Sequence, residues 1–139
     1  MNGLLILATV AVMLGGVAAG CCPYPGVPGT LLMINVTKEH YKCDKNLYIY
    51  CHYTNNGKSY FNGIAFNVTA PGPVDRSQML GETSVNVSDA AVNTRMTMIL
   101  YCDQEQSLWR IFADYYRKVW YENFICTRRA AGSEIYIGY

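Results

Sequence analysis

The chain has 139 residues, a length that favours one domain with a single modest core. Its 11 Lys and Arg and its 10 Asp and Glu leave a net charge of +1, so it lacks the one-sided field that binding to nucleic acid or to an anionic membrane uses. Only 15% of the residues are charged and 12 are tyrosines, and we therefore expect a surface covered largely by Tyr, Asn, Thr and Ser.

The N-terminus has the pattern of a cleaved signal peptide. An apolar run from Leu4 to Leu14 is followed by small residues at positions 15–20, which suit a signal peptidase. The run is about half the ~20 residues that a membrane-spanning helix needs. We therefore predict a signal peptide over residues 1–20 and a secreted, extracellular protein with no membrane span. Residues 18–21 also resemble a bacterial lipobox, in which the first mature Cys is lipidated.

Three Asn-x-Ser/Thr sequons begin at Asn35, Asn67 and Asn86. Three sequons in so short a chain favour the eukaryotic secretory pathway over the lipobox. Asn35 and Asn67 fall at outward positions of predicted strands, so we expect these two to carry glycans more readily than Asn86.

All the cysteines follow the predicted cleavage site, and an even number in a short exported chain predicts three disulfides. They are Cys21, Cys22, Cys43, Cys51, Cys102 and Cys126. Cys51 and Cys102 lie on the apolar faces of two predicted strands, so we predict that they pair. Cys43 and Cys126 then share Cys21 and Cys22, with Cys22–Cys126 preferred, because adjacent cysteines rarely bridge each other.

The same region offers a metal site as an alternative to disulfides. His40, Cys43, Cys51 and His52 would supply two imidazoles and two thiolates. Zinc sites more often combine two closely spaced Cys pairs, or a Cys pair with a His pair, and an oxidising compartment removes the thiolates. We therefore predict no metal and no cofactor.

Strand patterns account for most of the chain. After an irregular lead-in rich in Pro and Gly, residues 31–37 alternate between apolar and polar. Residues 46–54 and 59–68 flank an Asn-Gly turn and predict a β-hairpin. In its register Leu47 lies opposite Phe66 and Ile49 opposite Ile64, while Tyr48 and its alternate neighbours face the other way.

The second half of the chain is less regular. Residues 70–93 predict a long connection with an edge strand at 83–87, and alternation returns from Thr94, where Met96, Met98, Leu100 and Cys102 share a face. Residues 108–126 combine helical spacing with strand-forming residue types, and we predict strands at their two ends. The adjacent Arg128 and Arg129 indicate either a dibasic processing site or an exposed charge pair.

These patterns together predict an all-β fold, a small disulfide-bonded β-sandwich with an N-terminal signal peptide. We expect a disulfide-bonded extracellular domain over residues 21–127 and a C-terminal tail over residues 128–139.

The spacing of the landmarks resembles a known family. Cys43-x7-Cys51, an apolar hairpin, an alternating strand ending at Cys102, then Trp109 and Cys126, are similar to the nematode six-cysteine extracellular domain. The resemblance implies a secreted or surface domain and no particular activity. Complement-control modules, which also end in a single Trp flanked by cysteines, rank second.

Catalytic chemistry is not expected. The chain has two His, no Gly-x-Ser-x-Gly elbow and no glycine-rich phosphate loop, and every Cys has a candidate bridge partner. We therefore predict no enzyme and no catalytic residue.

The sequence favours a binding or interaction module instead. The solvent face of the predicted hairpin carries Tyr48, Tyr50, His52 and Phe61, and tyrosine is enriched at binding surfaces. The partner is expected to be an extracellular protein or glycan, not nucleic acid. The alternative for these rings is burial beneath a second layer such as residues 109–124. Two other functions stay open, a small β-barrel carrier of an apolar ligand and a Tyr-rich extracellular structural component.

Overall fold

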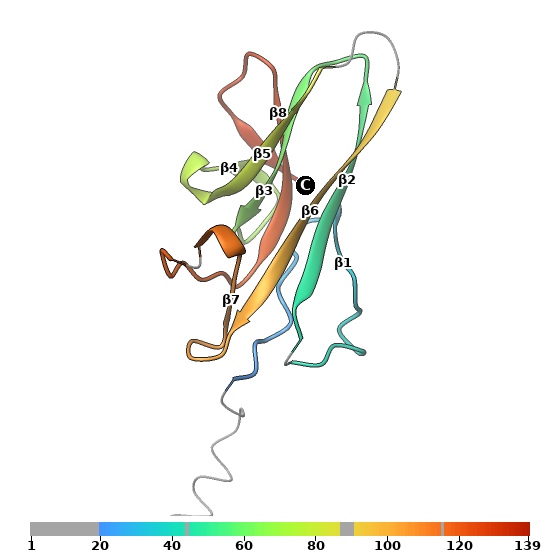
Figure 1. Ribbon diagram of the computed structural model, residues 1–139. Coiled ribbons are helices and arrows are strands. Elements are labelled where there is room, and N and C mark those ends of the chain that lie inside the picture. Colours follow the sequence, from blue (N-terminus) through green and yellow to red (C-terminus); the bar gives the residue numbers. More distant parts are fainter. Residues whose placement is uncertain (1–19, 44, 87–90, 115) are drawn as a thin grey trace, which may run out of the picture.

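The computed structural model describes residues 20–43, 45–86, 91–114 and 116–139, and the strands of this part form two antiparallel sheets (Figure 1). The four-stranded sheet has the order β1 (Leu32–Ile34), β2 (Leu47–Asn56), β6 (Ala91–Asp103) and β7 (Leu108–Arg110). The five-stranded sheet has the order β4 (Gly72–Val74), β9 (Tyr136–Gly138), β8 (Phe124–Ala130), β3 (Tyr60–Phe66) and β5 (Met79–Val85). Two short 3-10 turns are η1 (Arg76–Gln78) and η2 (Phe112–Asp114).

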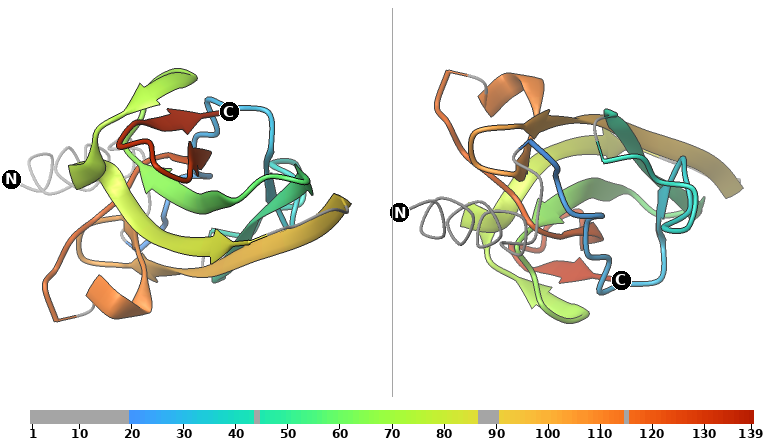
Figure 2. Two further views of the ribbon diagram at one scale, coloured as in Figure 1. Left: turned by 90° about the horizontal axis from the view of Figure 1, so that it is seen from above. Right: turned by 90° about the horizontal axis from the view of Figure 1, so that it is seen from below.

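The predicted all-β, disulfide-bonded sandwich is confirmed. Figure 2, which views the molecule from above and from below, shows the two curved sheets as separate layers around a shared interior. Of the predicted signal peptide, all but Gly20 lies outside the described residues. In the described ranges no helix is long and apolar enough to cross a membrane.

Strict alternation along β2 sets the inner and outer faces of the four-stranded sheet. Leu47, Ile49, Cys51 and Tyr53 are buried, and the residues between them face outward, as the pleat of a strand requires. The predicted inward face of β6 is confirmed too, because Met96, Met98, Leu100 and Cys102 all belong to the core between the sheets.

The predicted hairpin is wrong. β2 pairs with β1 and β6, whereas β3 pairs with β5 and β8, so the two strands belong to opposite sheets. Leu47 lies opposite Leu100, and Phe66 lies opposite Phe124. Gly57 does turn the chain with a φ of 65°, but the turn carries the chain across the sandwich. This arrangement lets the apolar faces of β2 and β3 face each other through the core.

The remaining segments hold more strand than predicted. Residues 70–93 contribute β4 and η1 as well as the edge strand β5, which begins at Met79 and pairs with β3. Residues 108–126 begin with β7 and end in β8, with η2 between them, so the prediction of strands at both ends is confirmed. The expected C-terminal tail, residues 128–139, supplies the end of β8 and all of β9 and is hydrogen-bonded into the five-stranded sheet.

Two of the three disulfides differ from those predicted, and Cys21–Cys43, which the preferred set implied, is confirmed. The bridges are Cys21–Cys43, Cys22–Cys102 and Cys51–Cys126, and no described cysteine is free. Both Cys51–Cys102 and the preferred Cys22–Cys126 are therefore wrong. β2 and β6 are neighbours in one sheet and point their inner side chains the same way, so the partner of Cys51 comes from the opposing sheet. The expectation that Cys21 and Cys22 do not bridge each other is confirmed.

Candidate interaction surface

The outer face of the four-stranded sheet gathers apolar and aromatic side chains that the pleat turns away from the core. Register places Tyr48 of β2 opposite Ile99 of β6, and Tyr50 opposite Met33 of β1. The exposed fractions are 51% for Met33, 46% for Tyr48 and 36% for Ile99, so these three rise from neighbouring strands into solvent.

Tyr50 is half-buried although nothing from the other sheet covers it. The guanidinium carbon of Arg95 lies 4.2 Å from the centroid of its ring, and the His52 ring lies 5.8 Å away. Arg95 and His52 are themselves exposed and lie opposite each other in the register. This stacking holds the Tyr50 ring against the sheet and places positive charge beside it.

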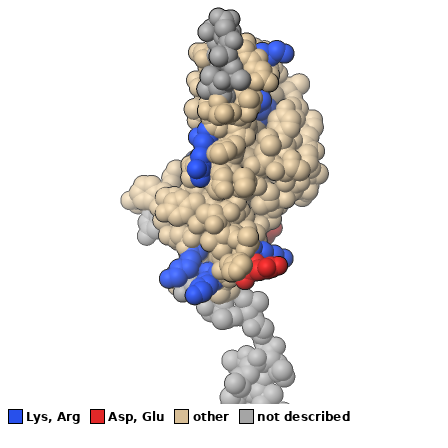
Figure 3. Space-filling model, turned by 90° about the vertical axis from the view of Figure 1, so that its right-hand side faces the viewer, with Lys and Arg blue, Asp and Glu red and all other residues tan. Residues whose placement is uncertain are grey.

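The surface continues toward β7. Tyr101 of β6 lies opposite Arg110, and its ring centroid is 6.4 Å from that of Phe112, which is 71% exposed. A cleft of about 340 Å³ opens between these side chains and Asn46. We call the set Met33, Tyr48, Tyr50, Ile99 and Tyr101 the tyrosine face. In Figure 3 most of the side of the molecule that includes β1 and β2 is uncharged, Lys and Arg are scattered over it, and Asp and Glu lie only in its lower part.

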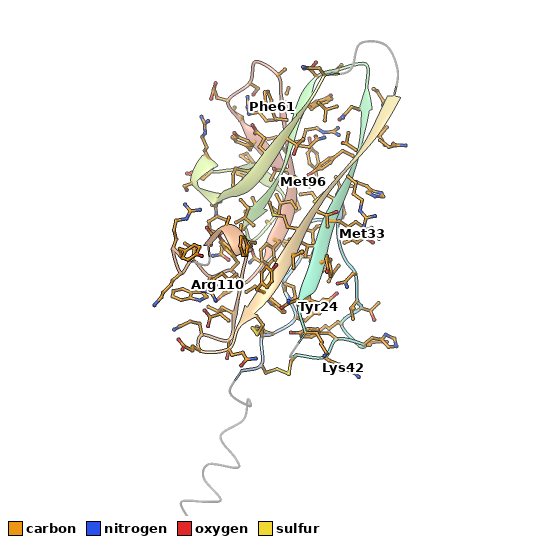
Figure 4. The ribbon with its side chains drawn as sticks, in the orientation of Figure 1. Tyr24, Met33, Lys42, Phe61, Met96 and Arg110 are labelled. Atoms are coloured by element: carbon orange, nitrogen blue, oxygen red, sulfur yellow. A yellow bond between two sulfur atoms is a disulfide. The ribbon has the colours of Figure 1, made fainter. Side chains whose placement is uncertain are left out.

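The structure brings three of the four predicted binding residues together and leaves the fourth apart. Tyr48, Tyr50 and His52 share the outer face of β2, whereas Phe61 lies on β3 in the other sheet. Figure 4 shows Phe61 and Met33 on opposite sides of the sandwich. Phe61 is half-buried beneath Arg129, whose guanidinium carbon is 4.0 Å from its ring.

The predicted covering layer does not form over Tyr48. Within residues 109–124, Trp109 is fully buried in the interior, where its indole N–H donates to the carbonyl oxygen of Pro23 at 2.6 Å. This segment closes one end of the core, and the tyrosine face stays open.

A carboxylate beside the β6–β7 turn has a structural role. Asp103 accepts hydrogen bonds from the Trp120 indole and from the backbone N–H groups of Glu105 and Gln106. The Trp120 bond is the largest cause of a lowered pKa at Asp103, with the Gln106 bond and the charge of Arg110 adding to it. The described residues hold no group of three or more side chains that could bind a metal.

The three sequon asparagines are exposed. Asn35 follows β1, and its Oδ1 accepts from the backbone N–H of Tyr48 at 3.0 Å. Asn67 lies just beyond β3, in a turn with a φ of 53°. Neither Asn35 nor Asn67 therefore lies within a strand, although the sequence had indicated strand positions for both. Its Oδ1 accepts from the N–H of Glu122 at 2.9 Å.

Sequence reasoning missed Met33, Ile99 and Arg95. Alternation along residues 94–102 assigned the even-numbered positions to the core. The odd-numbered positions, which include Arg95 and Ile99, would then have been assigned to the outer face. That Ile99 lies opposite Tyr48 and Arg95 stacks on Tyr50 depends on the pairing of β2 with β6, and the position of Met33 depends on the pairing of β1 with β2. No local pattern reveals either pairing.

No family model, no curated protein and no solved structure matches this chain. The site must therefore be interpreted from its own chemistry.

Proposed function

We propose that the protein is a secreted, glycosylated, non-enzymatic interaction module that contacts an extracellular protein or glycan through the tyrosine face. The observation that carries the proposal is the adjacent exposure of Met33, Tyr48 and Ile99 on three neighbouring strands. Single exposed apolar side chains are common on soluble proteins, but contiguous apolar patches more often mark an interaction site.

The chemistry of the face suits recognition. Tyrosine offers a large contact area with few rotatable bonds and a hydroxyl that can form a hydrogen bond. Arg95 is exposed beside Tyr50 and supplies a cationic group at the rim, where polar side chains surround the apolar centre of an interface. Such a face can stack on a sugar ring or pack against a protein surface.

Secretion and glycosylation are part of the same proposal. Every described cysteine is in a disulfide, and such bonds persist in oxidising compartments. The exposed Asn35, Asn67 and Asn86 are all accessible to a glycan. The carrier alternative lacks comparable support, because the described strands form two separate sheets and not one closed cylinder.

The test compares two double variants of the mature glycoprotein. Tyr48→Ser with Tyr50→Ser removes the aromatic centre of the face, while Tyr116→Ser with Ile135→Ser removes two exposed apolar side chains elsewhere. Partners are first identified by cross-linking and mass spectrometry in extracellular fluid of the native source, and by a glycan array. Affinity for each identified partner is then measured.

We expect the first double variant to bind at least about tenfold more weakly with an unchanged melting temperature. The control variant should bind like the wild type. Equal loss in both variants, or unchanged binding in the first, contradicts the proposal, and a collapsed melting temperature in the first variant shows that the rings act in folding.

A further inference from the structure

Two adjacent arginines of β8 have opposite surroundings. Arg129 points to the outer side of the five-stranded sheet, where it pairs with Glu82 at 3.2 Å and donates to the carbonyl oxygen of Ser133 at 2.7 Å. Arg128 points inward, toward β2. Both are half-buried within a paired strand, so they are neither an exposed charge pair nor an accessible dibasic site.

Arg128 is held entirely by neutral groups. Its Nε donates to Oδ1 of Asn62 at 3.1 Å, and its Nη2 donates to Oδ1 of Asn55 at 2.8 Å and to the carbonyl oxygen of Thr54 at 3.3 Å. Its guanidinium carbon also lies 4.4 Å from the Tyr60 ring and 5.2 Å from the Tyr53 ring.

The charge of Arg128 has no carboxylate partner among the residues that the structure describes. None of the salt bridges between described residues includes it, and its Nη1 donates no hydrogen bond to a described residue. A half-buried cation without an anion is unfavourable unless a counterion or solvent reaches it. The fold therefore fixes the guanidinium in place and leaves one of its nitrogens available.

A cleft opens beside Arg128. Its volume is about 320 Å³, and its lining consists of Leu31, His52, Tyr53, Thr54, Arg128 and Tyr139. The cleft lies along the edge of β2 that β1 leaves uncovered, because the β1–β2 pairing ends at Leu32 opposite Cys51.

The uncovered edge adds hydrogen-bond donors to the cleft. The backbone groups of Tyr48 face the β1 side, where they exchange hydrogen bonds with Asn35. Alternate residues of an antiparallel strand point their N–H and C=O groups to the same edge, so those of His52 and Thr54 face this side as well. The Thr54 carbonyl is taken by Arg128, and its N–H group remains on the open edge.

We propose that this cleft binds a carboxylate attached to a short apolar body. The carboxylate pairs with the Nη1 side of Arg128, and the apolar body packs against Leu31 and the Tyr139 ring. Arginine is suited to this role because its guanidinium stays charged and its other nitrogens are already fixed by Asn62, Asn55 and Thr54. In Figure 3 basic side chains, and no acidic ones, lie in the upper part of this side of the molecule. The site is separate from the tyrosine face, although His52 borders both.

The probe is phenylacetate, and phenylacetamide is its uncharged match. Each is titrated at constant ionic strength into the 15N-labelled mature protein, and backbone and Arg Nε–H signals are followed by NMR. We expect saturable shifts at Thr54 and at Arg128 Nε, with phenylacetamide binding at least about tenfold more weakly. Equal binding of the two probes, or shifts that do not saturate, overturns the proposal.

Two variants test whether the carboxylate binds at Arg128. Leu31→Glu puts a negative charge at the mouth of the cleft from a position that is 38% exposed, and Phe112→Glu makes the same change at the 71% exposed Phe112 outside it. We expect at least about tenfold weaker phenylacetate binding for Leu31→Glu and no change for Phe112→Glu. Wild-type affinity in Leu31→Glu refutes the assignment.

Arg128→Lys tests the fixed guanidinium. An ammonium keeps the charge but cannot keep the bonds to Asn62, Asn55 and Thr54 while aiming an N–H group into the cleft, so affinity should fall about tenfold while the NMR spectrum stays that of a folded protein. If this variant binds as tightly as the wild type, Arg128 is not the anchor. The Leu31→Glu comparison decides the proposal if Arg128→Lys does not fold. Partner binding through the tyrosine face does not enter any of these readouts.

Discussion

The outer faces of the two sheets differ although they come from one short chain. On the five-stranded sheet, Ala65 and Ile125 are fully buried beneath Val68, Val74 and Tyr136, which form a second small core. On the four-stranded sheet the tyrosine face has no such cover. Side chains from the loop after β3 and from the strands β4 and β9 at one edge of the same sheet cover this face, and the other face is left in solvent.

This difference shows that the exposure of the tyrosine face is not a general consequence of low charge content. The five-stranded sheet also has apolar outward positions, Ala65 and Ile125, and the chain covers them. Glycines make that cover tight, because a side chain at Gly138 would meet Ile125 and Val74. The open face is therefore an apolar surface that the described segments leave largely uncovered.

The largest effect is expected where the two sheets are joined. Cys51–Cys126 links β2 to β8 across the core and spans 75 residues, so replacing both cysteines by Ala should lower the free energy of unfolding by about 4 kcal/mol. The half-buried Cys21–Cys43 bridge spans 22 residues, and the same change there should cost about 3 kcal/mol. Urea unfolding of both double variants measures the difference. A larger loss at Cys21–Cys43 would mean that the N-terminal lead-in, and not the contact between the sheets, limits stability.

Two isoleucines compare the outer faces directly. Ile125 is fully buried under the second small core, so Ile125→Ala should destabilise the protein by about 3 kcal/mol. Ile99 is 36% exposed on the tyrosine face, so Ile99→Ala should cost less than about 1 kcal/mol. Thermal and urea unfolding give both values. Equal losses would show that the tyrosine face is packed in solution.

Two tyrosines of β2 extend the comparison from the outer face to the inner one. Tyr53 is buried, its hydroxyl donates to the carbonyl oxygen of Gly63 at 2.7 Å, and desolvation raises its pKa to about 12. Because the fold favours the neutral phenol, this contribution to stability is fully present below pH 10 and is lost as the pH rises toward 12. The loss should reach roughly 2 kcal/mol.

Tyr53→Phe removes this dependence, so the stabilities of variant and wild type should converge above pH 10. Tyr48→Phe, on the exposed side of the same strand, should keep the wild-type profile. Urea unfolding between pH 8 and 12, together with absorbance of the phenolate, measures both. A Tyr53→Phe variant that keeps the full alkaline loss would assign it to another group.

Local patterns predicted which way side chains face, but not which strands are neighbours. The alternation of Leu47, Ile49, Cys51 and Tyr53 was visible in the sequence, because one buried face requires it. The Asn-Gly signal at residues 56–57 was visible too. A turn there suits a hairpin within one sheet and equally a crossing between two sheets, and the choice depends on long-range pairing with β6.

The other errors follow from that one. Phe61 was placed beside His52 because the hairpin was assumed, and it lies on the other sheet. Cys51 was paired with Cys102 because both lie on the apolar faces of predicted strands, but β2 and β6 are neighbours in one sheet, so the two side chains point the same way and not toward each other. The site was thus predicted as far as the single strand β2 extends, and its neighbours Met33 and Ile99 required the structure.

The smallest expected effect concerns the glycan beside each face. Asn35 borders the tyrosine face next to Tyr48, while Asn67 follows β3 of the covered sheet. In both asparagines, Oδ1 accepts a hydrogen bond from a backbone N–H group, and Nδ2 has no hydrogen bond to a described residue, so a glycan on Nδ2 leaves the Oδ1 bond intact.

Asn35→Asp and Asn67→Asp keep the hydrogen-bond acceptor and remove the nitrogen to which a glycan attaches. Each should lose the mass of one glycan with little change in stability. Asn35→Ala, which also loses the acceptor for Tyr48, should unfold about 1 kcal/mol more easily than Asn35→Asp. Intact-mass analysis with and without a glycosidase, followed by urea unfolding, separates the two effects. An unchanged mass for Asn35→Asp from eukaryotic cells would show that the edge of the tyrosine face carries no glycan.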